Sequence, residues 1–436
     1  MSKKIKPKYD AVVIGAGIGG LLAASFLVKK GFSVCVLERL SFCGGKFTGF
    51  NYKGFQIPSG AFHMIPAVAK SGFGRCFADL GINIEYIRPG SAAAMVLDKG
   101  IRYPLYNAPI RNFFPNSYLW KFSMRELLDF AALAHSFYRK KTSLPDILFS
   151  DFLKIFTESR RIMKLIDQIM IFSNGTDIYN ASLVEFRNSI KTVKFDKEAC
   201  IKGGCRHLID ELTAYIEAGG GEIFNRTAVN KILISKNKAV GVELESGRKI
   251  KAEIAVSNAG PGRTVGMLGN NTPKRLAEKA KTLKPVHGIS YSIATDRPLL
   301  NHDAVEIPMD ADHIAGYVQI TNLDPGLAPG GKHLLLAAQM AIDPKVKITD
   351  AIEKGVSDIL AIFPQITRNN IINISSFHKG WAAAPTGQIL GQTGEKRYPV
   401  KVEPFENFYM LGYDSAGWGF AGDIIGHAAW DFQNMI

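Results

Sequence analysis

The sequence predicts an α/β protein of two or three domains, and two observations carry this prediction. The chain has 436 residues, which is more than one ordinary hydrophobic core supports. Near its start, a short apolar run, a glycine-rich turn, an apolar helical stretch and a second apolar run follow one another. This order is typical of a strand–helix–strand unit in a parallel sheet. Apolar residues make up 47% of the chain and charged residues 21%, which excludes a disordered or fibrous protein.

Charge and cysteine content limit the partners and the compartment. The net charge of +14 predicts contact with something anionic. The basic residues are dispersed and no recognition motif is present, so we expect no nucleic acid. Five cysteines without a C-x-x-C pair predict neither a disulfide framework nor a metal site, and they favour a reducing compartment, the cytoplasm. The apolar stretch 11–28 contains clustered glycines and no cleavage site follows it, so we interpret it as neither a signal peptide nor a membrane span.

Residues 10–38 have the pattern of a dinucleotide-binding unit. A β-branched strand is followed by a G-x-G-x-x-G turn, a helix that stops near Gly31, and a second strand that ends at Glu38. The turn consists of Gly15, Ala16, Gly17, Ile18, Gly19 and Gly20. The sequence therefore predicts that this unit binds the diphosphate and ribose of a dinucleotide.

Each part of this unit has a physical role toward such a ligand. Gly15 permits the tight turn, Gly17 lets the backbone approach a pyrophosphate, and Gly20 lets the helix pack closely on the sheet. The helix N-terminus offers unpaired N–H groups to the phosphates. The Glu38 carboxylate accepts hydrogen bonds from ribose hydroxyls, which suits FAD or NAD and disfavours NADP.

The segment after the second strand favours FAD. Arg39 follows Glu38 directly, then comes a Cys-Gly-Gly-Lys stretch that ends at Lys46, and the segment 54–63 ends in His63. This arrangement resembles the second glycine motif of the amine oxidase and phytoene desaturase superfamily of flavoproteins. The resemblance implies FAD contacts from Arg39, Gly44, Gly45, Lys46 and Gly60. Glycines permit close backbone approach, and the Lys46 ammonium would supply positive charge to the diphosphate.

Later segments extend the resemblance. Residues 201–212 resemble the family's return into the FAD domain, and the residue that matches Val229 meets the adenine ring through its backbone. Residues 407–426 resemble the last strand, a Gly-Asp turn and a glycine-rich entry into the closing helix. The FAD contacts implied there are Gly412, Asp414, Gly419, Ala421 and Gly422. This chain reads Gly-Tyr-Asp instead of Gly-Asp, and it lacks the Pro-Gly-rich signature of bacterial carotenoid desaturases.

The resemblance implies a discontinuous, Rossmann-like FAD-binding domain of the glutathione-reductase type. Its pieces are expected near residues 1–80, 197–265 and 395–436. A substrate-binding domain of mixed sheet and helix is expected at residues 81–196 and 266–394.

Aromatic and basic residues occur together in the first part of this substrate domain. Ser123 and Glu126 have the spacing of a capping box, and the helix that they would start carries Leu127, Phe130, Ala134 and Phe137 on one stripe. Three basic residues at 139–141 follow it. The stripe is interpreted either as core packing, or as part of a membrane-facing surface near residues 101–172. The second interpretation predicts a peripheral contact with anionic lipid, because the family's desaturases take lipid substrates from membranes.

The resemblance implies an FAD-dependent oxidoreductase similar to phytoene desaturases and carotenoid isomerases, with an apolar isoprenoid or polyene substrate. Desaturation would move a hydride from a CH–CH unit to flavin N5, with loss of a proton from the adjacent carbon. Isomerisation would use reduced FAD without net oxidation. One alternative is a flavin amine oxidase, which would release peroxide on addition of an amine. The other is a non-enzymatic escort for lipids or prenyl groups, which would have no need of the intact glycine turn.

Few protein groups are expected to carry the chemistry, because the flavin does the redox work. His63 is the first candidate for a catalytic role, and a structural hydrogen bond to the backbone is its alternative. Asp414 and His427 are further candidates that could equally shape the cofactor site. No cluster has the spacing of metal ligands, so no metal is expected.

Overall fold

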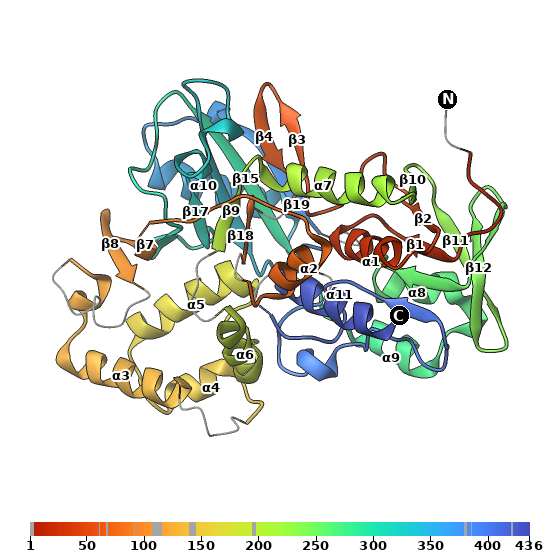
Figure 1. Ribbon diagram of the computed structural model, residues 1–436. Coiled ribbons are helices and arrows are strands. Elements are labelled where there is room, and N and C mark those ends of the chain that lie inside the picture. The colour runs from red at the N-terminus through yellow and green to blue at the C-terminus, as the bar shows by residue number, and fades with distance from the viewer. Residues whose placement is uncertain are drawn as a thin grey trace.

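The computed structural model describes residues 4–60, 62–66, 69–90, 92–106, 116–138, 145–193, 198–378, 382–384, 386–419 and 422–436. Within these residues two main sheets lie side by side, each with its own layer of helices (Figure 1). The N-terminal segment starts in the first sheet, and the chain returns to it twice after excursions into the second.

The first main sheet has five parallel strands in the order β10-β2-β1-β14-β20. Its members are β1 (Ala11–Ile14), β2 (Val34–Leu37), β10 (Glu222–Phe224), β14 (Ile254–Ser257) and β20 (Phe408–Met410). These strands come from the beginning, middle and end of the chain. The predicted α/β fold with a discontinuous Rossmann-like sheet is confirmed.

Alternate residues of the central strand are buried in two different layers, as the two-residue period of a strand requires. Ala11 and Val13 pack with helices, whereas Val12 and Ile14 pack with the layer on the opposite face. The helical layer contains α1 (Ile18–Lys29), α2 (Gly72–Leu80), α7 (Gly204–Ala218) and α11 (Asp423–Met435). The opposite layer contains β11 (Val229–Ser235), β12 (Lys238–Leu244), β13 (Lys249–Lys251), α8 (Pro261–Leu268) and α9 (Lys274–Thr282).

The second main sheet has seven strands in the order β19-β15-β18-β17-β16-β7-β8. Neighbouring strands are antiparallel, except for the parallel pair of β16 and β7. Its members are β7 (Ala92–Asp98), β8 (Ile101–Tyr106), β15 (Gly288–Thr295), β16 (Glu306–Pro308), β17 (Gly316–Val318), β18 (His333–Met340) and β19 (Ile371–Phe377). Helix α10 (Ile348–Ile362) packs on one face, and α5 (Arg160–Asn174) contacts β16 and β18.

Four helices cluster beside this sheet around a second apolar core. They are α3 (Met124–Tyr138), α4 (Phe149–Lys154), α5 and α6 (Leu183–Val193). The capping box predicted at the start of α3 is confirmed, because the Ser123 Oγ accepts from the Glu126 N at 3.2 Å and the Glu126 Oε2 accepts from the Ser123 N at 2.8 Å. The side chain of Phe137 and the basic residues 139–141 lie outside the described part of the chain.

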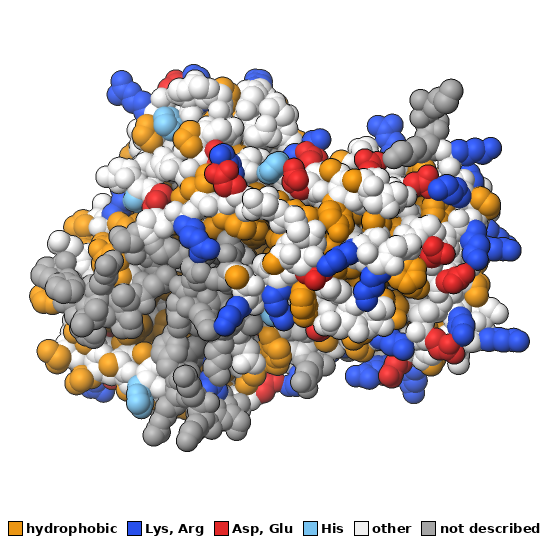
Figure 2. Space-filling view, in the orientation of Figure 1, with side chains coloured by type: hydrophobic (Ala, Val, Ile, Leu, Met, Phe, Trp, Pro, Cys, Tyr) orange, Lys and Arg blue, Asp and Glu red, His pale blue; other side chains and the backbone are white. Residues whose placement is uncertain are grey.

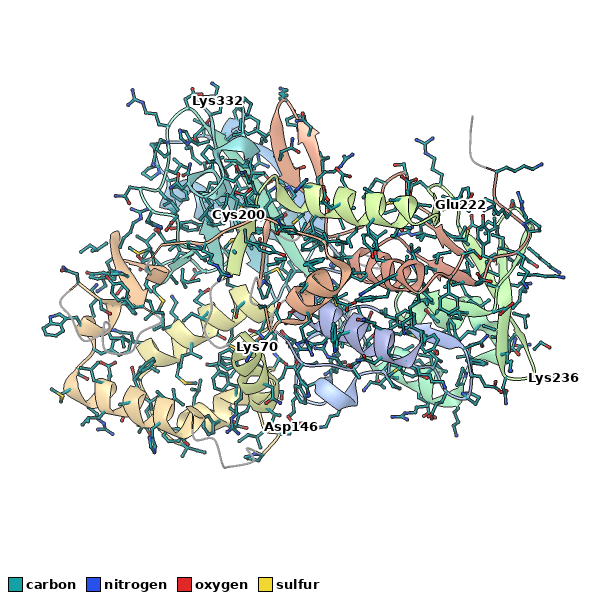
Figure 3. The ribbon with its side chains drawn as sticks, viewed as in Figure 1. Lys70, Asp146, Cys200, Glu222, Lys236 and Lys332 are labelled. Carbon is teal, nitrogen blue, oxygen red and sulfur yellow. The ribbon has the colours of Figure 1, made fainter. Side chains whose placement is uncertain are left out.

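Short elements connect the two halves. The strands are β3 (Gly49–Tyr52), β4 (Phe55–Pro58), β5 (Met64–Pro66), β6 (Tyr86–Ile87) and β9 (Glu198–Ile201). The 3₁₀ turns are η2 (Tyr118–Lys121), η3 (Gly269–Asn271), η4 (Ile320–Asn322), η5 (Pro325–Leu327), η6 (Arg368–Asn370) and η7 (Gly394–Lys396). Cys200 of β9, labelled in Figure 3, packs with residues of β17 and β18 in the second main sheet.

Charge is distributed unevenly over the surface. Lys and Arg side chains gather at the end that carries β11 and β12, and Lys236 lies at the tip of this hairpin (Figures 2 and 3). Apolar side chains are visible at the opposite end, over α3 and β8 (Figure 2). None of the helices in the described ranges is long and apolar enough to cross a bilayer.

A buried ion pair joins α6 to the segment before β20. The Arg397 Nη2 lies 3.3 Å from the Glu185 Oε1, and both side chains are fully buried. The Gln388 Nε2 donates to the same Glu185 oxygen at 2.8 Å, and the Gly394 N donates to the other at 3.1 Å. Arg397 Nη1 also donates to the Tyr413 carbonyl oxygen at 2.8 Å. Because every charge has several partners, the pair can be buried without a large penalty.

Replacing Arg397 by Met should lower the free energy of unfolding by about 3–5 kcal/mol, because it leaves the Glu185 carboxylate buried without its cation. The matched control is Arg368→Met, which breaks the exposed pair with Glu353 and should cost less than about 1 kcal/mol. Chemical unfolding of the purified protein measures both free energies of unfolding. Equal losses for the two variants would contradict the structural importance of the buried pair.

Candidate functional site

The glycine turn between β1 and α1 forms the floor of a cradle at the carboxyl edge of the parallel sheet. Gly15 has a φ of +96°, which side chains rarely adopt. A Cβ on Gly17 would lie 2.4 Å from the Asn258 Oδ1, and one on Gly20 would lie 2.1 Å from the Gly15 carbonyl oxygen. Only glycines therefore let the turn, the loop after β14 and the first turn of α1 approach one another this closely.

The buried Glu38 closes one side of the cradle. Its Oε2 accepts a hydrogen bond from the Ala16 N at 2.7 Å, and its Oε1 accepts one from the Leu40 N at 2.8 Å. Each carboxylate oxygen retains a further lone pair, which can accept a ribose hydroxyl. The loop that leads into β11 lies alongside, because the Thr227 N donates to the Glu38 carbonyl oxygen at 2.7 Å. Val229 lines the same cavity as Glu38.

The second glycine segment runs beside the first. The Gly44 N donates to the Ala16 carbonyl oxygen at 2.7 Å, and a Cβ on Gly44 would lie 2.6 Å from the Thr48 Cβ. A Cβ on Gly60 would lie 2.6 Å from the Lys46 carbonyl oxygen, so this later glycine also permits a close crossing. Gly44, Gly45 and Gly60 all line the cradle cavity.

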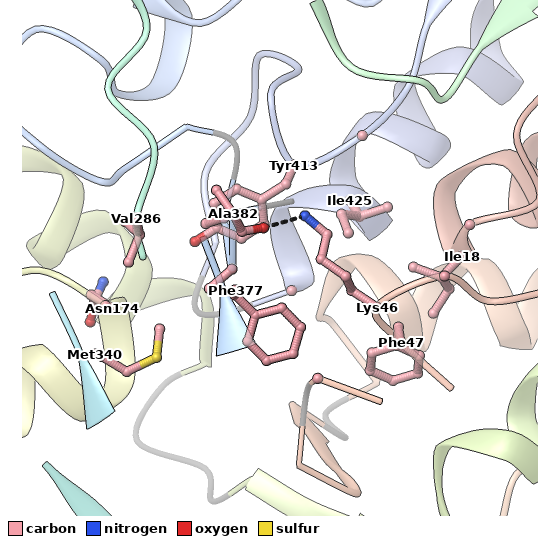
Figure 4. A pocket seen from close by; sticks show the side chains of 18 of the residues that line it. Ile18, Lys46, Phe47, Asn174, Val286, Met340, Phe377, Ala382, Tyr413 and Ile425 are labelled. Atoms are coloured by element: carbon pink, nitrogen blue, oxygen red, sulfur yellow. Dashed lines mark hydrogen bonds between the residues drawn. The ribbon is translucent and has the colours of Figure 1, made fainter. Parts of the chain in front are cut away.

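Lys46 points away from the glycine turn. Its Nζ donates to the Ala382 carbonyl oxygen at 2.6 Å, between Tyr413 and Ile425 (Figure 4). Burial lowers the pKa of Lys46, and the charge of Asp414 partly offsets this effect. In this structure the Lys46 ammonium therefore contacts the backbone of residue 382, and its contact with a diphosphate stays a prediction.

Two arginines also supply positive charge to the cradle. Arg39 and Arg263 both line it, and Arg263 is the third residue of α8. Burial lowers the pKa of Arg263, and the positive charge of Arg39 lowers it further, so the two side chains lie within electrostatic range. The sequence analysis missed Arg263, although it follows the Asn-Ala-Gly-Pro turn that leaves β14.

The C-terminal segment completes the cradle. Gly412, Asp414 and Gly422 line the cavity, and Gly422 is the N-cap of α11. The Asp414 Oδ1 accepts from the Thr386 Oγ1 at 2.6 Å. Burial raises the pKa of the Asp414 carboxyl, and the Thr386 hydrogen bond and the charges of Lys46 and Arg397 oppose this.

Three of the predicted contacts within the described residues do not line the cavity. Ala16 and Gly20 stabilise the turn itself. The Ala16 N donates to the Glu38 carboxylate, and Gly20 lies close to the Gly15 carbonyl oxygen. Gly419 supports the loop instead, because its carbonyl oxygen accepts from the Gln388 Nε2 at 3.0 Å. Ala421 lies outside the described residues.

His63 is fully buried away from the cavity. Its Nε2 lies 2.7 Å from the Gln56 carbonyl oxygen, and its Nδ1 accepts from the Cys205 N at 3.0 Å. Burial lowers its pKa to about 4, so the ring stays neutral at physiological pH. This geometry favours the structural alternative over the catalytic one. His427 is likewise engaged, with its Nδ1 2.6 Å from the Arg75 Nη2, and it does not line the cavity.

The cradle continues without interruption into an apolar chamber, and together they form one cavity of about 1530 Å³. The chamber lies between β15 and β18 on one side and α3 and α5 on the other. Its wall is formed by side chains such as Phe130, Ala134, Ile166, Phe172, Ile289 and Met340. Among the described lining residues, the charged ones are Glu38, Arg39, Lys46, Glu245, Arg263 and Asp414. None of these belongs to the four elements that enclose the chamber.

This arrangement provides two environments in one cavity. The cradle offers glycine backbone, a helix N-terminus, two arginines and a carboxylate, which together fit the diphosphate and ribose of FAD. The chamber offers a dry apolar space at the end where Lys46, Phe377 and Ala382 lie (Figure 4). An elongated cofactor can therefore reach from the glycine turn to the mouth of the chamber.

Comparison with known proteins gives the family. Residues 18–423 match the flavin containing amine oxidoreductase family, so the chain belongs to that family. The solved structure of an oxidoreductase from Methanosarcina mazei matches with a TM-score of 0.86 and 28% identity, over 98% of this chain and 100% of that one. An uncharacterized protein of Methanocaldococcus jannaschii is 29% identical over 85% of this chain and 86% of its own length. Prolycopene isomerase 2 of an Oncidium hybrid cultivar is 25% identical over 75% of this chain, but over only 63% of its own length.

The family and the cradle agree on the cofactor. FAD is the cofactor of this chain, and the chain is an FAD-dependent oxidoreductase. The predicted resemblance is therefore confirmed. The escort alternative, which needs no cofactor cradle, is not retained.

Replacing Gly17 by Ala should weaken FAD binding roughly 10- to 100-fold, because the new Cβ displaces the partly buried Asn258 amide from its hydrogen bond to the Leu411 carbonyl oxygen, a loss of about 1–3 kcal/mol. The control is Gly262→Ala in α8, where a Cβ would have no atom within 4 Å, so FAD affinity should be unchanged. Titration of the apoprotein with FAD, followed by flavin fluorescence, measures both affinities. Wild-type affinity in the Gly17 variant would contradict the assignment of the cradle.

Proposed function

Starting from this family membership, we propose that the chain acts on an apolar isoprenoid or polyene. The observation that carries the proposal is the continuity of the cradle with the uncharged chamber. Burial of a hydrocarbon chain against apolar walls lowers its free energy by about 25 cal/mol for each Å² removed from water. The prolycopene isomerase relative, by its name, acts on a substrate of this kind.

We propose that the cradle residues hold FAD as the sequence analysis expects, with Arg263 added. Arg39, Arg263 and the N-terminus of α1 would hold the diphosphate, and the Glu38 carboxylate would accept from the ribose. Gly412, Asp414 and Gly422, which line the same cavity, would hold the rest of the cofactor. When bound there, FAD supplies a two-electron acceptor for desaturation or, in its reduced state, a redox centre for isomerisation.

The chamber residues would position the substrate and exclude water. Phe130 and Ala134 of α3 face the cavity together with Phe172 of α5 and Met340 of β18. Their apolar side chains would hold a C–C unit of the substrate against the end of the cradle where Lys46 lies. A dry surrounding protects reactive intermediates and prevents proton leakage.

A second candidate is an amine oxidase, as the family name suggests. Aromatic side chains, among them Phe62, Phe130, Phe172 and Phe377, line the cavity and could stabilise an ammonium group by cation–π contacts. Among the described lining residues, however, no carboxylate comes from the elements that enclose the chamber. At the cradle end of the cavity, the charged side chains that the amine would approach include the cation Lys46. Peroxide release on addition of aliphatic amines separates this candidate from the polyene proposal.

Filling the chamber should weaken polyene turnover selectively. Ala134→Trp inserts a large side chain at a lining position. The value of kcat/KM for polyenes delivered in liposomes should fall about 10-fold or more, because a loss of about 1.4 kcal/mol of binding free energy corresponds to a factor of ten. Ala214→Trp is the matched control, since it is exposed on α7, far from α3 in the chain, and does not line the cavity. Chromatography of the products measures both rates.

An equal loss of polyene turnover in the Ala214 variant would contradict the role of the chamber. Peroxide formation from amines, together with no conversion of polyenes by the wild type, would replace the proposal with the amine oxidase candidate. FAD content is measured in each variant, so a defect in cofactor binding is recognised separately.

We also propose that the α3 end of the molecule touches a membrane surface. Trp120, Met124, Leu128 and Ile155 are 61–73% exposed on η2, on α3 and at the end of α4. Exposed cations, Arg125 and Lys154, stand next to them in the sequence. An apolar surface with a cationic rim is typical of contact with anionic lipid. Because α3 also lines the chamber, a substrate could enter from the bilayer directly.

The double change Met124→Glu and Leu128→Glu should reduce binding to anionic liposomes about 10-fold or more. Both side chains lie on one face of α3, and the change replaces two apolar side chains by two negatively charged ones. The control is Val240→Glu on β12, an exposed apolar residue at the far end. Liposome cosedimentation measures the binding. Unchanged binding of the double variant would place the lipid contact elsewhere.

A further inference from the structure

A second cavity of about 280 Å³ lies apart from the cofactor cavity, between α9 and the segment that follows η7. Its walls are formed by Arg275, Glu278, Lys279 and Thr282 of α9 and by Lys396, Arg397, Tyr398 and Pro399. Four of these eight residues are cations and one is an acid. Neither the cofactor nor the proposed substrate uses this cavity.

Two of the four cations are paired with acidic residues that do not line the cavity. Lys396 pairs with Asp146, which lies at the edge of the molecule beside α6 (Figure 3). Arg397 pairs with the buried Glu185. By contrast, no ion pair or hydrogen bond joins the side chain of Arg275 or Lys279 to any residue in the described ranges. The acid Glu278 is exposed and lies 3.9 Å from the Nζ of Lys274.

The arrangement is electrostatically unfavourable as it stands. Arg275 and Lys279 are four residues apart on α9, so two like charges lie on the same face of the helix. Burial lowers the pKa of Lys279, and the charges of Arg275, Lys396 and Arg397 lower it further. A bound anion would remove this repulsion and would find donors already directed into a cavity.

We propose that this cavity binds a phosphate or diphosphate group of a small soluble molecule. Arg275 offers the forked donors that suit phosphate oxygens, and Lys279 offers a point charge. The volume equals that of roughly nine water molecules, at about 30 Å³ each, which is sufficient for a diphosphate. The binding donors come from α9, whereas Lys396 and Arg397 add positive charge and stay in their pairs with Asp146 and Glu185.

The surroundings favour a soluble ligand over a lipid headgroup. Among the described residues, no exposed large apolar side chain lies in α9 or at positions 394–399. The exposed apolar residues of the proposed membrane surface are on η2, α3 and α4 instead. A headgroup in this cavity would therefore find no exposed large apolar side chain of α9 or of residues 394–399 for the attached acyl chains.

One hydrogen bond of Arg397 links the second cavity to the cofactor site. The Arg397 that lines it donates from Nη1 to the carbonyl oxygen of Tyr413, at 2.8 Å. Tyr413 and its neighbour Asp414 line the cofactor cavity. The proposed anion would thus lie one side chain away from the cradle, without taking part in it.

Isothermal titration of the FAD-loaded full-length protein with pyrophosphate, at fixed ionic strength, tests the proposal. Loading with FAD keeps pyrophosphate out of the cradle. We expect saturable binding of one pyrophosphate per chain and a rise in melting temperature with concentration. The double change Arg275→Gln and Lys279→Gln should weaken binding by about tenfold or more, because it removes two charge-assisted contacts.

Lys274→Gln is the matched control, because it removes an exposed lysine from the same helix that does not line the cavity, and affinity should change by less than about twofold. Absence of saturable binding, or equal affinity in the double variant, would overturn the proposal. A parallel arm uses vesicles that contain phosphatidic acid. If the double change weakens vesicle binding and free pyrophosphate does not bind, the soluble source is wrong.

Discussion

The close crossing of two backbone turns at Gly17 and Asn258 is the contact on which the rest of the site depends. The Asn258 Oδ1 occupies the space that a side chain at residue 17 would need, and its Nδ2 donates to the Leu411 carbonyl oxygen at 2.5 Å. One amide thus connects the ends of β1, β14 and β20, which come from distant parts of the chain. Because the strands are parallel, these ends meet at one edge of the sheet, where ligands of such folds bind.

The remainder of the molecule adds an apolar chamber to this edge. The second main sheet and α3 to α6 enclose the chamber. A buried polar network joins α5 and α6 to the loop beside the cradle. In this network the Asn174 Nδ2 donates to the Gln388 Oε1 at 2.7 Å, and Gln388 in turn bonds Glu185. Buried networks of this kind are stable only when every member is satisfied. The same side chains therefore fix the chamber wall and the loop beside the cradle.

The sequence is informative where neighbouring residues set the geometry. The glycine turn and Glu38 can be predicted because strand, turn, helix and strand are contiguous. The direction of Lys46 could not be predicted, because its partner Ala382 is 336 residues away. Arg263 belongs to a helix whose approach to the cradle depends on the pairing of β14 with β1. A lone histidine such as His63 is ambiguous until its partners, the backbone of Gln56 and Cys205, are known. The chamber has no local signature, since its wall combines residues from the second main sheet and from α3 to α6.

The central claim is that an apolar substrate in the chamber touches the cofactor held in the cradle. The most direct test is the visible absorption spectrum of the FAD-loaded protein during anaerobic addition of a polyene in liposomes, with an aliphatic diamine in a parallel titration. The account predicts that the polyene shifts or bleaches the flavin bands and that the diamine leaves them unchanged. Flavin bands that respond to the diamine alone would contradict it.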